Sequence, residues 1–334
     1  MTSTTTTLLP PLLLFLLTVL LPPLSHSQLT YDYYAKTCPK FDDIMRDTVA
    51  QKQNTTPTTA AAVLRLFFHD CMVEGCDAST LVAASPLHRT ERDPSLNLDL
   101  PGDAFDTVVR AKTALELECP DIVSCADILA VATRNLVALV GGPAYRVPLG
   151  RKDGLVSDAS RVEPNLLKPT MPASQIIAFF VSRGFTVQEM VTLMGGHTIG
   201  FSHCREFSYR LYNFSRTSPT DPALNPKYAE GLKKLCENYT KDPTMSAFND
   251  VMTPGKFDNV YYQNLEKGLG LLASDQAMAA DQRTKPFVEL YARNETAFFT
   301  AFARVMEKLS TYKIKTGKDG EVRHRCDQTN TVNI

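Results

Sequence analysis

The most informative segment of the chain is Arg65-Leu-Phe-Phe-His69-Asp70-Cys71. Residues 60–66, which overlap its start, are good helix formers, and on a helix Arg65 and His69 project from the same face because they are four residues apart. A guanidinium beside an imidazole lowers the proton affinity of that imidazole, which keeps it neutral and available as a base. For such a pair alone, the alternative is an ordinary helix face with a surface arginine and a satisfied histidine.

Outward from this stretch the periodicity is mostly helical. Residues 124–127 (Ser-Cys-Ala-Asp) form a capping box ahead of apolar residues spaced three and four apart, and residues 141–143 (Gly-Gly-Pro) end that segment. A second capping box, residues 186–189 (Thr-Val-Gln-Glu), starts a short helix that ends at two glycines directly before His197.

A third apolar stripe runs from Phe298 to Leu309, on a helix expected to begin at Asn294. Clean period-two patterns of strands are few. The sequence therefore predicts an all-α class with small β elements.

The N-terminus predicts the compartment. An apolar run from Leu8 to Leu24 is interrupted only by prolines and Thr18, and small polar residues follow it. This is typical of a signal peptide, residues 1–27, with cleavage near Ser27. A membrane anchor is the alternative, but the run falls short of the roughly 20 residues of a span. No later segment is apolar for long enough to cross a bilayer.

The remaining residues, 28–334, are expected to form one domain, because no repeat, low-complexity tract or linker divides them. The net charge of −1 argues against nucleic acid as a partner. Eight cysteines behind a signal peptide are typical of four disulfides in an oxidising compartment. Sequons agree with a secreted, extracellular or cell-wall protein; they begin at Asn54, Asn213, Asn238 and Asn294.

The stretch 65–71 resembles the distal haem motif of class III plant secretory peroxidases, and residues 195–200 (Gly-Gly-His-Thr-Ile-Gly) resemble their proximal haem-ligand motif. The resemblance covers nearly the whole mature chain, in the family's order and spacing. It includes residues 70–79, similar to the family's distal calcium loop, residues 149–153 (Leu-Gly-Arg-Lys-Asp) and residues 274–276 (Ser-Asp-Gln). It implies a helical, two-lobed haem peroxidase fold with one haem b between the lobes.

The resemblance also implies a role for each site residue. His197 would ligate the haem iron, and Asp275 would accept its other ring proton and make the imidazole more anionic. On the opposite haem face His69 would take a proton from hydrogen peroxide and return it to the departing oxygen. Arg65 would stabilise the charge that separates as the O–O bond breaks. Asn97 would accept the Nδ1 proton of His69 and leave Nε2 free.

The aromatic residues distinguish branches of the haem peroxidases. The intracellular class has tryptophan on both haem faces, whereas this chain has none, and Phe68 occupies the distal aromatic position. Electrons are then expected to enter at the exposed haem edge.

Calcium takes about six to eight oxygen ligands, and the resemblance implies two calcium sites. The first would use side-chain or backbone oxygens of Asp70, Val73, Gly75, Asp77 and Ser79; the second would use Thr198, Asp250, Thr253, Lys256 and Asp258. Each ion would brace a histidine, since His69 and His197 directly precede a ligand. A polar turn closed by a disulfide is the alternative for the first loop.

Eight cysteines allow many pairings, and the residues alone do not choose among them. The resemblance implies the pairs Cys38–Cys119, Cys71–Cys76, Cys125–Cys326 and Cys204–Cys236.

The chain departs from the family's pattern near the haem edge. Where the family usually has Asn-Leu-Pro-x-Pro at the edge that donors reach, residues 165–169 are Asn-Leu-Leu-Lys-Pro, so the backbone at Leu167 is less fixed. The Leu167 carbonyl and Pro169 remain the expected contacts of a phenol. Residues 98–105 also differ from the common Arg-Gly-Phe form, and Thr58 stands where an arginine is often found near the haem propionates. Both changes make this edge less basic.

The sequence as a whole predicts a secreted, monomeric haem peroxidase that reduces hydrogen peroxide and oxidises small phenolic donors in one-electron steps. One alternative is a secreted haem-binding protein without significant turnover, against which the intact catalytic set argues. Another is a secreted glycoprotein with no cofactor, which would show no Soret band. A metalloprotease is excluded, because the chain has no His-Glu-x-x-His motif.

Overall fold

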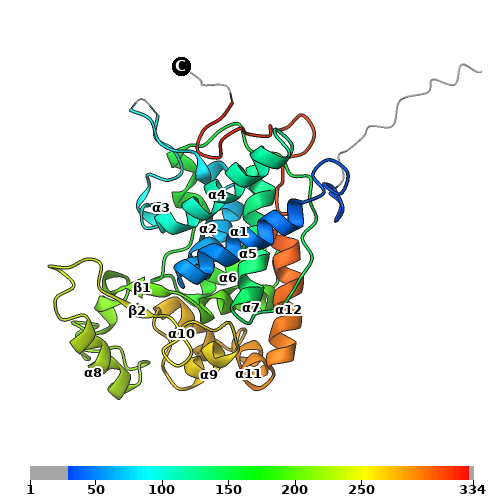
Figure 1. The fold of residues 1–334 in the computed structure, drawn as a ribbon. Helices are drawn as coiled ribbons and strands as arrows, with labels where there is room; N and C mark the ends of the chain where they lie inside the picture. The colour runs from blue at the N-terminus through cyan, green and yellow to red at the C-terminus, as the bar shows by residue number, and fades with distance from the viewer. Residues whose placement is uncertain (1–28, 87, 331–334) are drawn as a thin grey trace, which may run out of the picture.

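The computed structural model describes residues 29–86 and 88–330 and is mostly helical (Figure 1). The helices are α1 (Phe41–Thr55), α2 (Thr59–Met72), α3 (Ser95–Leu98), α4 (Gly102–Glu118), α5 (Cys125–Leu139), α6 (Ala173–Ser182), α7 (Val187–Met194), α8 (Pro226–Leu235), α9 (Val260–Glu266), α10 (Ala273–Ala280), α11 (Lys285–Arg293) and α12 (Glu295–Leu309). Strands β1 (Phe201–His203) and β2 (Ser246–Phe248) pair antiparallel. The predicted all-α class with small β elements is confirmed. The predicted signal peptide lies outside the described residues.

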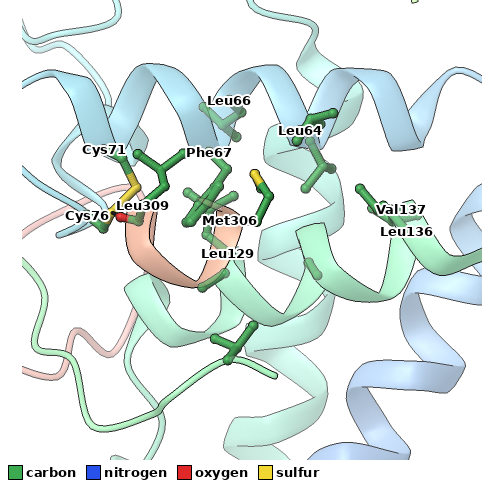
Figure 2. Close-up of a cluster of buried hydrophobic side chains, with 14 of the residues drawn as sticks. Leu64, Leu66, Phe67, Cys71, Cys76, Leu129, Leu136, Val137, Met306 and Leu309 are labelled. Carbon is green, nitrogen blue, oxygen red and sulfur yellow. Dashed lines mark hydrogen bonds between the residues drawn. A yellow bond between two sulfur atoms is a disulfide. The ribbon is translucent and has the colours of Figure 1, made fainter. Parts of the chain in front are cut away.

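Two groups of helices make the two lobes. Helices α1, α2, α4 and α5 pack on one another in the N-terminal half, and α9, α10 and α11 pack together in the C-terminal half (Figure 1). Helix α12 contacts α7 and α11, while its Met306 and Leu309 lie beside Phe67 of α2 and Leu129 of α5 (Figure 2). A continuous apolar core therefore joins the halves through α12.

The chain after α12 returns to the N-terminal half. Isolated β-bridges pair Lys152 with Lys315 and Asp153 with Glu321, and a disulfide joins α5 to the tail. The structure has the disulfides Cys38–Cys119, Cys71–Cys76, Cys125–Cys326 and Cys204–Cys236, the pairing implied by the family pattern.

The helix ends differ in one respect from the prediction. At α5 the Ser124 side chain accepts from the Asp127 amide, but the reciprocal half of the capping box is absent. The Asp127 carboxylate instead lies 2.8 Å from the buried Arg151 guanidinium and 2.7 Å from the Tyr34 hydroxyl. A buried cation needs a charged partner more than the helix end needs a second cap.

The other two predicted helix starts are confirmed. A full capping box opens α7, with the Thr186 and Glu189 side chains each bonded to the other's backbone amide. The Asn294 side chain accepts from the Ala297 amide at the start of α12. Among the described residues no single helix is long and apolar enough to cross a membrane, although α6 and residues 187–198 pass by length and composition as a pair bent by 111°.

Candidate active site

One face of α2 is partly accessible to solvent, while its other side chains pack in the core. Leu66 and Phe67 are buried in the core, whereas Arg65 is exposed and Phe68 and His69 are half-buried. The helical repeat places the two polar side chains together because they are four residues apart. The predicted pairing of Arg65 with His69 on one face is therefore present.

A hydrogen bond fixes the tautomer of His69. Its Nδ1 lies 2.6 Å from Oδ1 of Asn97, and the amide nitrogen of Asn97 donates to the Glu91 carbonyl at 2.6 Å. The Asn97 oxygen can only accept, so Nδ1 carries the proton and Nε2 has the lone pair. Burial, followed by the Arg65 charge, lowers the pKa of His69 to about 3. His69 is therefore a neutral base.

The short helix α3 holds both distal residues. Besides carrying Asn97, it presents the carbonyls of Leu96 and Asp99 to the Arg65 guanidinium, at 3.4 Å and 3.1 Å. The Asp99 carboxylate forms an ion pair with Arg205, which comes from the C-terminal half. The sequence did not reveal these contacts, because backbone acceptors have no residue signature and a four-residue helix shows no period.

Gly195 stands two residues before His197, and no other residue could replace it without displacing neighbouring side chains. A Cβ on Gly195 would overlap the Tyr262 hydroxyl and the Phe298 ring, so glycine lets the 3₁₀ turn η4 (Gly195–Thr198) pack against α9 and α12. His197 in this turn places its Nδ1 2.9 Å from Oδ1 of Asp275 in α10. Burial lowers the pKa of His197, but the charge and hydrogen bond of Asp275 outweigh it and raise the pKa.

The side chains of Arg65, His69 and His197 are accessible to solvent although they lie deep in the protein. The His197 side chain is 38% exposed, and the other two are also accessible, yet burial is the first cause acting on the pKa of each. The Arg65 charge lowers the pKa of both histidines, and His197 lowers that of His69. We infer that the three side chains line one internal space.

The residues around this space fit a haem. The Asp275 carboxylate accepts a hydrogen bond from Nδ1–H of His197, which leaves Nε2 unprotonated as a nitrogen ligand for iron. Within the described part of the chain, Nε2 of His197 makes no hydrogen bond. The half-buried ring of Phe68 lies 6.3 Å from the His69 ring, centroid to centroid, as an apolar side of the same site.

The first expected calcium loop gathers buried carboxylates. Asp70, Asp77 and Glu91 are each at most 4% exposed, and Oε1 of Glu91 has no hydrogen-bond partner among the residues that the structure describes. Burial, then the charge of Asp77, raises the pKa of Asp70 well above its usual range, and burial raises that of Glu91 to about 8. A hard cation would relieve this repulsion. Val73 and Gly75 lie in the loop that the Cys71–Cys76 disulfide closes.

Sequence reasoning missed Glu91. Its Oε2 accepts from the Ser79 hydroxyl at 2.9 Å, and its carbonyl accepts from Asn97, so it joins the loop to the distal histidine's partner. No motif surrounds Glu91, and the six-residue interval to Asn97 is the only signal in the sequence.

Some residues of the second expected calcium set also lie close together. The Thr253 hydroxyl lies 3.2 Å from Oδ2 of Asp250 and 3.1 Å from Oδ1 of Asp258. The Thr198 hydroxyl lies 3.5 Å from the Lys256 carbonyl. No group of three or more His, Cys, Asp or Glu side chains in the described residues is arranged to hold a metal. The expected sets consist largely of hydroxyl and carbonyl oxygens, so the calcium sites stay a prediction.

The segment expected to meet donors is tied to the proximal side. Leu166 is buried, Leu167 is half-buried against the core, and the Pro169 carbonyl accepts from the Ser274 amide at 3.1 Å. Ser274 directly precedes Asp275. Thr58 is exposed at the N-terminus of α2.

Comparisons with known proteins agree with this geometry. A family model described as "Peroxidase" matches residues 45–294. Peroxidase 6 of Arabidopsis thaliana is 59% identical over 310 residues, which cover 92% of this chain and 94% of that protein. Peroxidase 65 of the same plant is 59% identical over 306 residues, 92% of this chain and 90% of that protein. Peroxidase 51 of the same plant is 47% identical over 309 residues, which cover 92% of this chain and 94% of that protein.

Proposed function

The chain belongs to the plant secretory peroxidases, which makes it an enzyme that uses hydrogen peroxide to oxidise donors, and on this premise we propose how its residues, cofactors and donors work together. The family implies haem. We propose that His197 holds the iron of one haem b through Nε2. When bound, the haem supplies the two-electron redox chemistry that splits peroxide and then takes electrons from donors.

The protein's own residues would move the proton. His69 accepts a proton from peroxide at Nε2 and returns it to the departing oxygen, because its Nδ1 is already occupied by the bond to Asn97. Arg65 stabilises the charge that develops as the O–O bond breaks. Asp275 accepts a hydrogen bond from Nδ1 of His197, which holds the proton on Nδ1 and leaves Nε2 to the iron.

One observation carries this proposal. Both histidines are held at Nδ1, His69 at 2.6 Å from Asn97 and His197 at 2.9 Å from Asp275, so both have an unprotonated Nε2 at the same internal space. Nε2 of His69 accepts a hydrogen bond from Nε of Arg65 at 3.4 Å. This arrangement does not favour a haem-binding protein without turnover, which would need neither a neutral base nor a guanidinium beside it.

Two calcium ions are proposed to hold the loops that follow the histidines. The first loop supports this with buried carboxylates and the unpaired Glu91 oxygen, and the second with Asp250 and Asp258 bridged by a threonine hydroxyl. The expected ligands are Asp70, Val73, Gly75, Asp77 and Ser79, and Thr198, Asp250, Thr253, Lys256 and Asp258.

Small phenols are proposed as donors, at the edge formed by Leu167 and Pro169. The absence of tryptophan from the chain supports entry of electrons at this edge. The mature protein is proposed to be a secreted, monomeric, single domain of residues 28–334. The signal sequence and the disulfides support secretion.

The proposal is tested on the purified protein. We expect a Soret band, about one haem per chain, and peroxide-dependent oxidation of a panel of phenols with saturation kinetics. His197→Ala should lose stable haem binding or turnover, and Gln188→Ala, on the nearby helix α7, serves as a control that leaves both unchanged. A protein without a Soret band, or a His197→Ala variant with normal spectra and activity, would contradict the proximal assignment.

A further inference from the structure

Two adjacent tyrosines of α9 lie beneath the turn that carries His197. Tyr261 is 1% exposed and Tyr262 is fully buried. The Tyr261 ring stands edge-on to the His197 imidazole, with centroids 6.4 Å apart and planes at 83°. Each of the two tyrosines thus places a phenol in the same buried region.

The two phenols differ in their hydrogen bonds. The Tyr262 hydroxyl donates to the Val191 carbonyl at 2.9 Å. Neither the Tyr261 hydroxyl nor Oδ2 of Asp275 has a hydrogen-bond partner among the described groups, although both are sealed from solvent. A buried polar group without a partner destabilises the fold, so a donor and an acceptor left over in one place are expected to pair.

Both leftover atoms belong to side chains beside His197: the Tyr261 ring stands edge-on to its imidazole, and Oδ1 of the same Asp275 carboxylate lies 2.9 Å from its Nδ1. Burial is the main cause that raises the pKa of Tyr261, and the charge of Asp275 and hydrogen bonding to it act in the same direction. Tyr228 also feels the charge of Asp275, but hydrogen bonding to Asp275 is not among the causes that raise its pKa.

We propose that the Tyr261 hydroxyl donates a hydrogen bond to Oδ2 of Asp275 and so positions that carboxylate against His197. Tyr261 is then a positioning residue, which acts on the haem ligand through Asp275. The inference rests on the proposed role of His197 as the iron ligand.

This second bond has a defined electronic consequence. A carboxylate that already accepts from a phenol is a weaker acceptor for the Nδ1 proton of His197. The imidazole is then less anionic than Asp275 alone would make it. Removing the phenol should strengthen the bond between His197 and the iron and stabilise the ferric state.

The test compares Tyr261→Phe with Tyr262→Phe in the haem-loaded protein. Each variant removes one buried phenol oxygen, but only the first removes a donor to Asp275. We expect Tyr261→Phe to move the iron–histidine stretching band of the ferrous protein to higher wavenumber and to lower the ferric/ferrous potential. Tyr262→Phe should leave both at the wild-type values. Equal spectra and potentials for Tyr261→Phe and wild type, or equal shifts in the two variants, would overturn the inference.

Asp275→Asn separates this inference from the proposed function. If Asp275→Asn leaves the stretching band unchanged, His197 is not the ligand and the proposed function fails. If Asp275→Asn shifts the band while Tyr261→Phe does not, only the role of Tyr261 fails. Should Tyr261→Phe not accumulate, 3-fluorotyrosine at position 261 is a stronger donor, and it should shift the band in the opposite direction; a band that does not move would also overturn the inference.

Discussion

His69 and His197 are both held at Nδ1, but by partners of different charge. The neutral Asn97 does not outweigh burial and the Arg65 charge, so the pKa of His69 is lowered to about 3. The anionic Asp275 outweighs burial, so the pKa of His197 is raised. One residue type thus becomes a neutral base on one side and an electron-rich ligand on the other.

The lowered pKa of His69 predicts how the peroxide step responds to acid. The neutral imidazole is the active form, and it persists above its pKa, so the rate should hold as the pH falls through the ordinary value of 6.5 and decline only toward about 3. Stopped-flow measurement of the reaction with peroxide, with calcium present, checks this. A midpoint near 6.5 would show that the environment of His69 has been misjudged.

Replacing His69 by Ala should slow the reaction with peroxide by about 10²–10⁴-fold, because general acid–base catalysis is lost. Oxidation of donors should change less. Arg65→Leu should also slow the peroxide step, through loss of charge stabilisation, so added imidazole should rescue the His69 variant better than the Arg65 variant. A His69→Ala protein that reacts at nearly the wild-type rate would remove the acid–base role.

Among the helices and loops, α3 has the largest influence for its length. Its four residues supply the Asn97 side chain to His69 and the Leu96 carbonyl to Arg65. The adjacent Asp99 gives Arg65 a second carbonyl, and its carboxylate is paired with Arg205 of the other half. The orientation of both distal groups therefore depends on one turn of helix.

Asn97→Ala should reduce the rate of the peroxide step by about 10–100-fold, the usual effect of losing a group that orients a reacting residue. Asp99→Asn is the milder comparison: it weakens a partly exposed ion pair, worth less than about 1 kcal/mol, and keeps the carbonyl that Arg65 uses. Its rate should fall less than about fivefold. Stopped-flow rates of both variants decide the order, and a larger loss for Asp99→Asn would contradict it.

Sequence patterns predicted the elements that are long or capped, and missed the short ones. Helices α7 and α12 begin where their capping residues indicate. The strands and α3 have only three or four residues, too few to show a period. Similarly, the histidines and their partners stand in motifs, whereas Glu91 and Tyr261 act through contacts that only the folded chain creates.

For the whole molecule, the core through α12 and the returning tail join the two halves between which the site residues lie. The Cys125–Cys326 disulfide closes a separation of 201 residues. By the chain-entropy relation, such a cross-link stabilises the folded state by about 5 kcal/mol. Bound calcium would add to this by holding the loops that follow both histidines.

Removal of calcium should therefore lower activity and the melting temperature together, with recovery when calcium is restored. The physical reason is that buried carboxylates such as Asp70 and Glu91, whose pKa values burial raises, would lose the positive charge that compensates them. Thermal melts and assays with chelator, and with chelator plus excess calcium as the control, measure this. A melting temperature that chelator leaves unchanged, or purified protein without calcium, would count against both sites.

The Cys125–Cys326 pair also sets an order of events during synthesis. Cys326 is the last of the eight cysteines to leave the ribosome, whereas Cys38 and Cys71 have partners no farther along than Cys119. Cys125 must remain a thiol until almost the whole chain has emerged. A chain truncated before Cys326 would carry that thiol permanently, and quality control that retains free thiols in an oxidising compartment would hold it back.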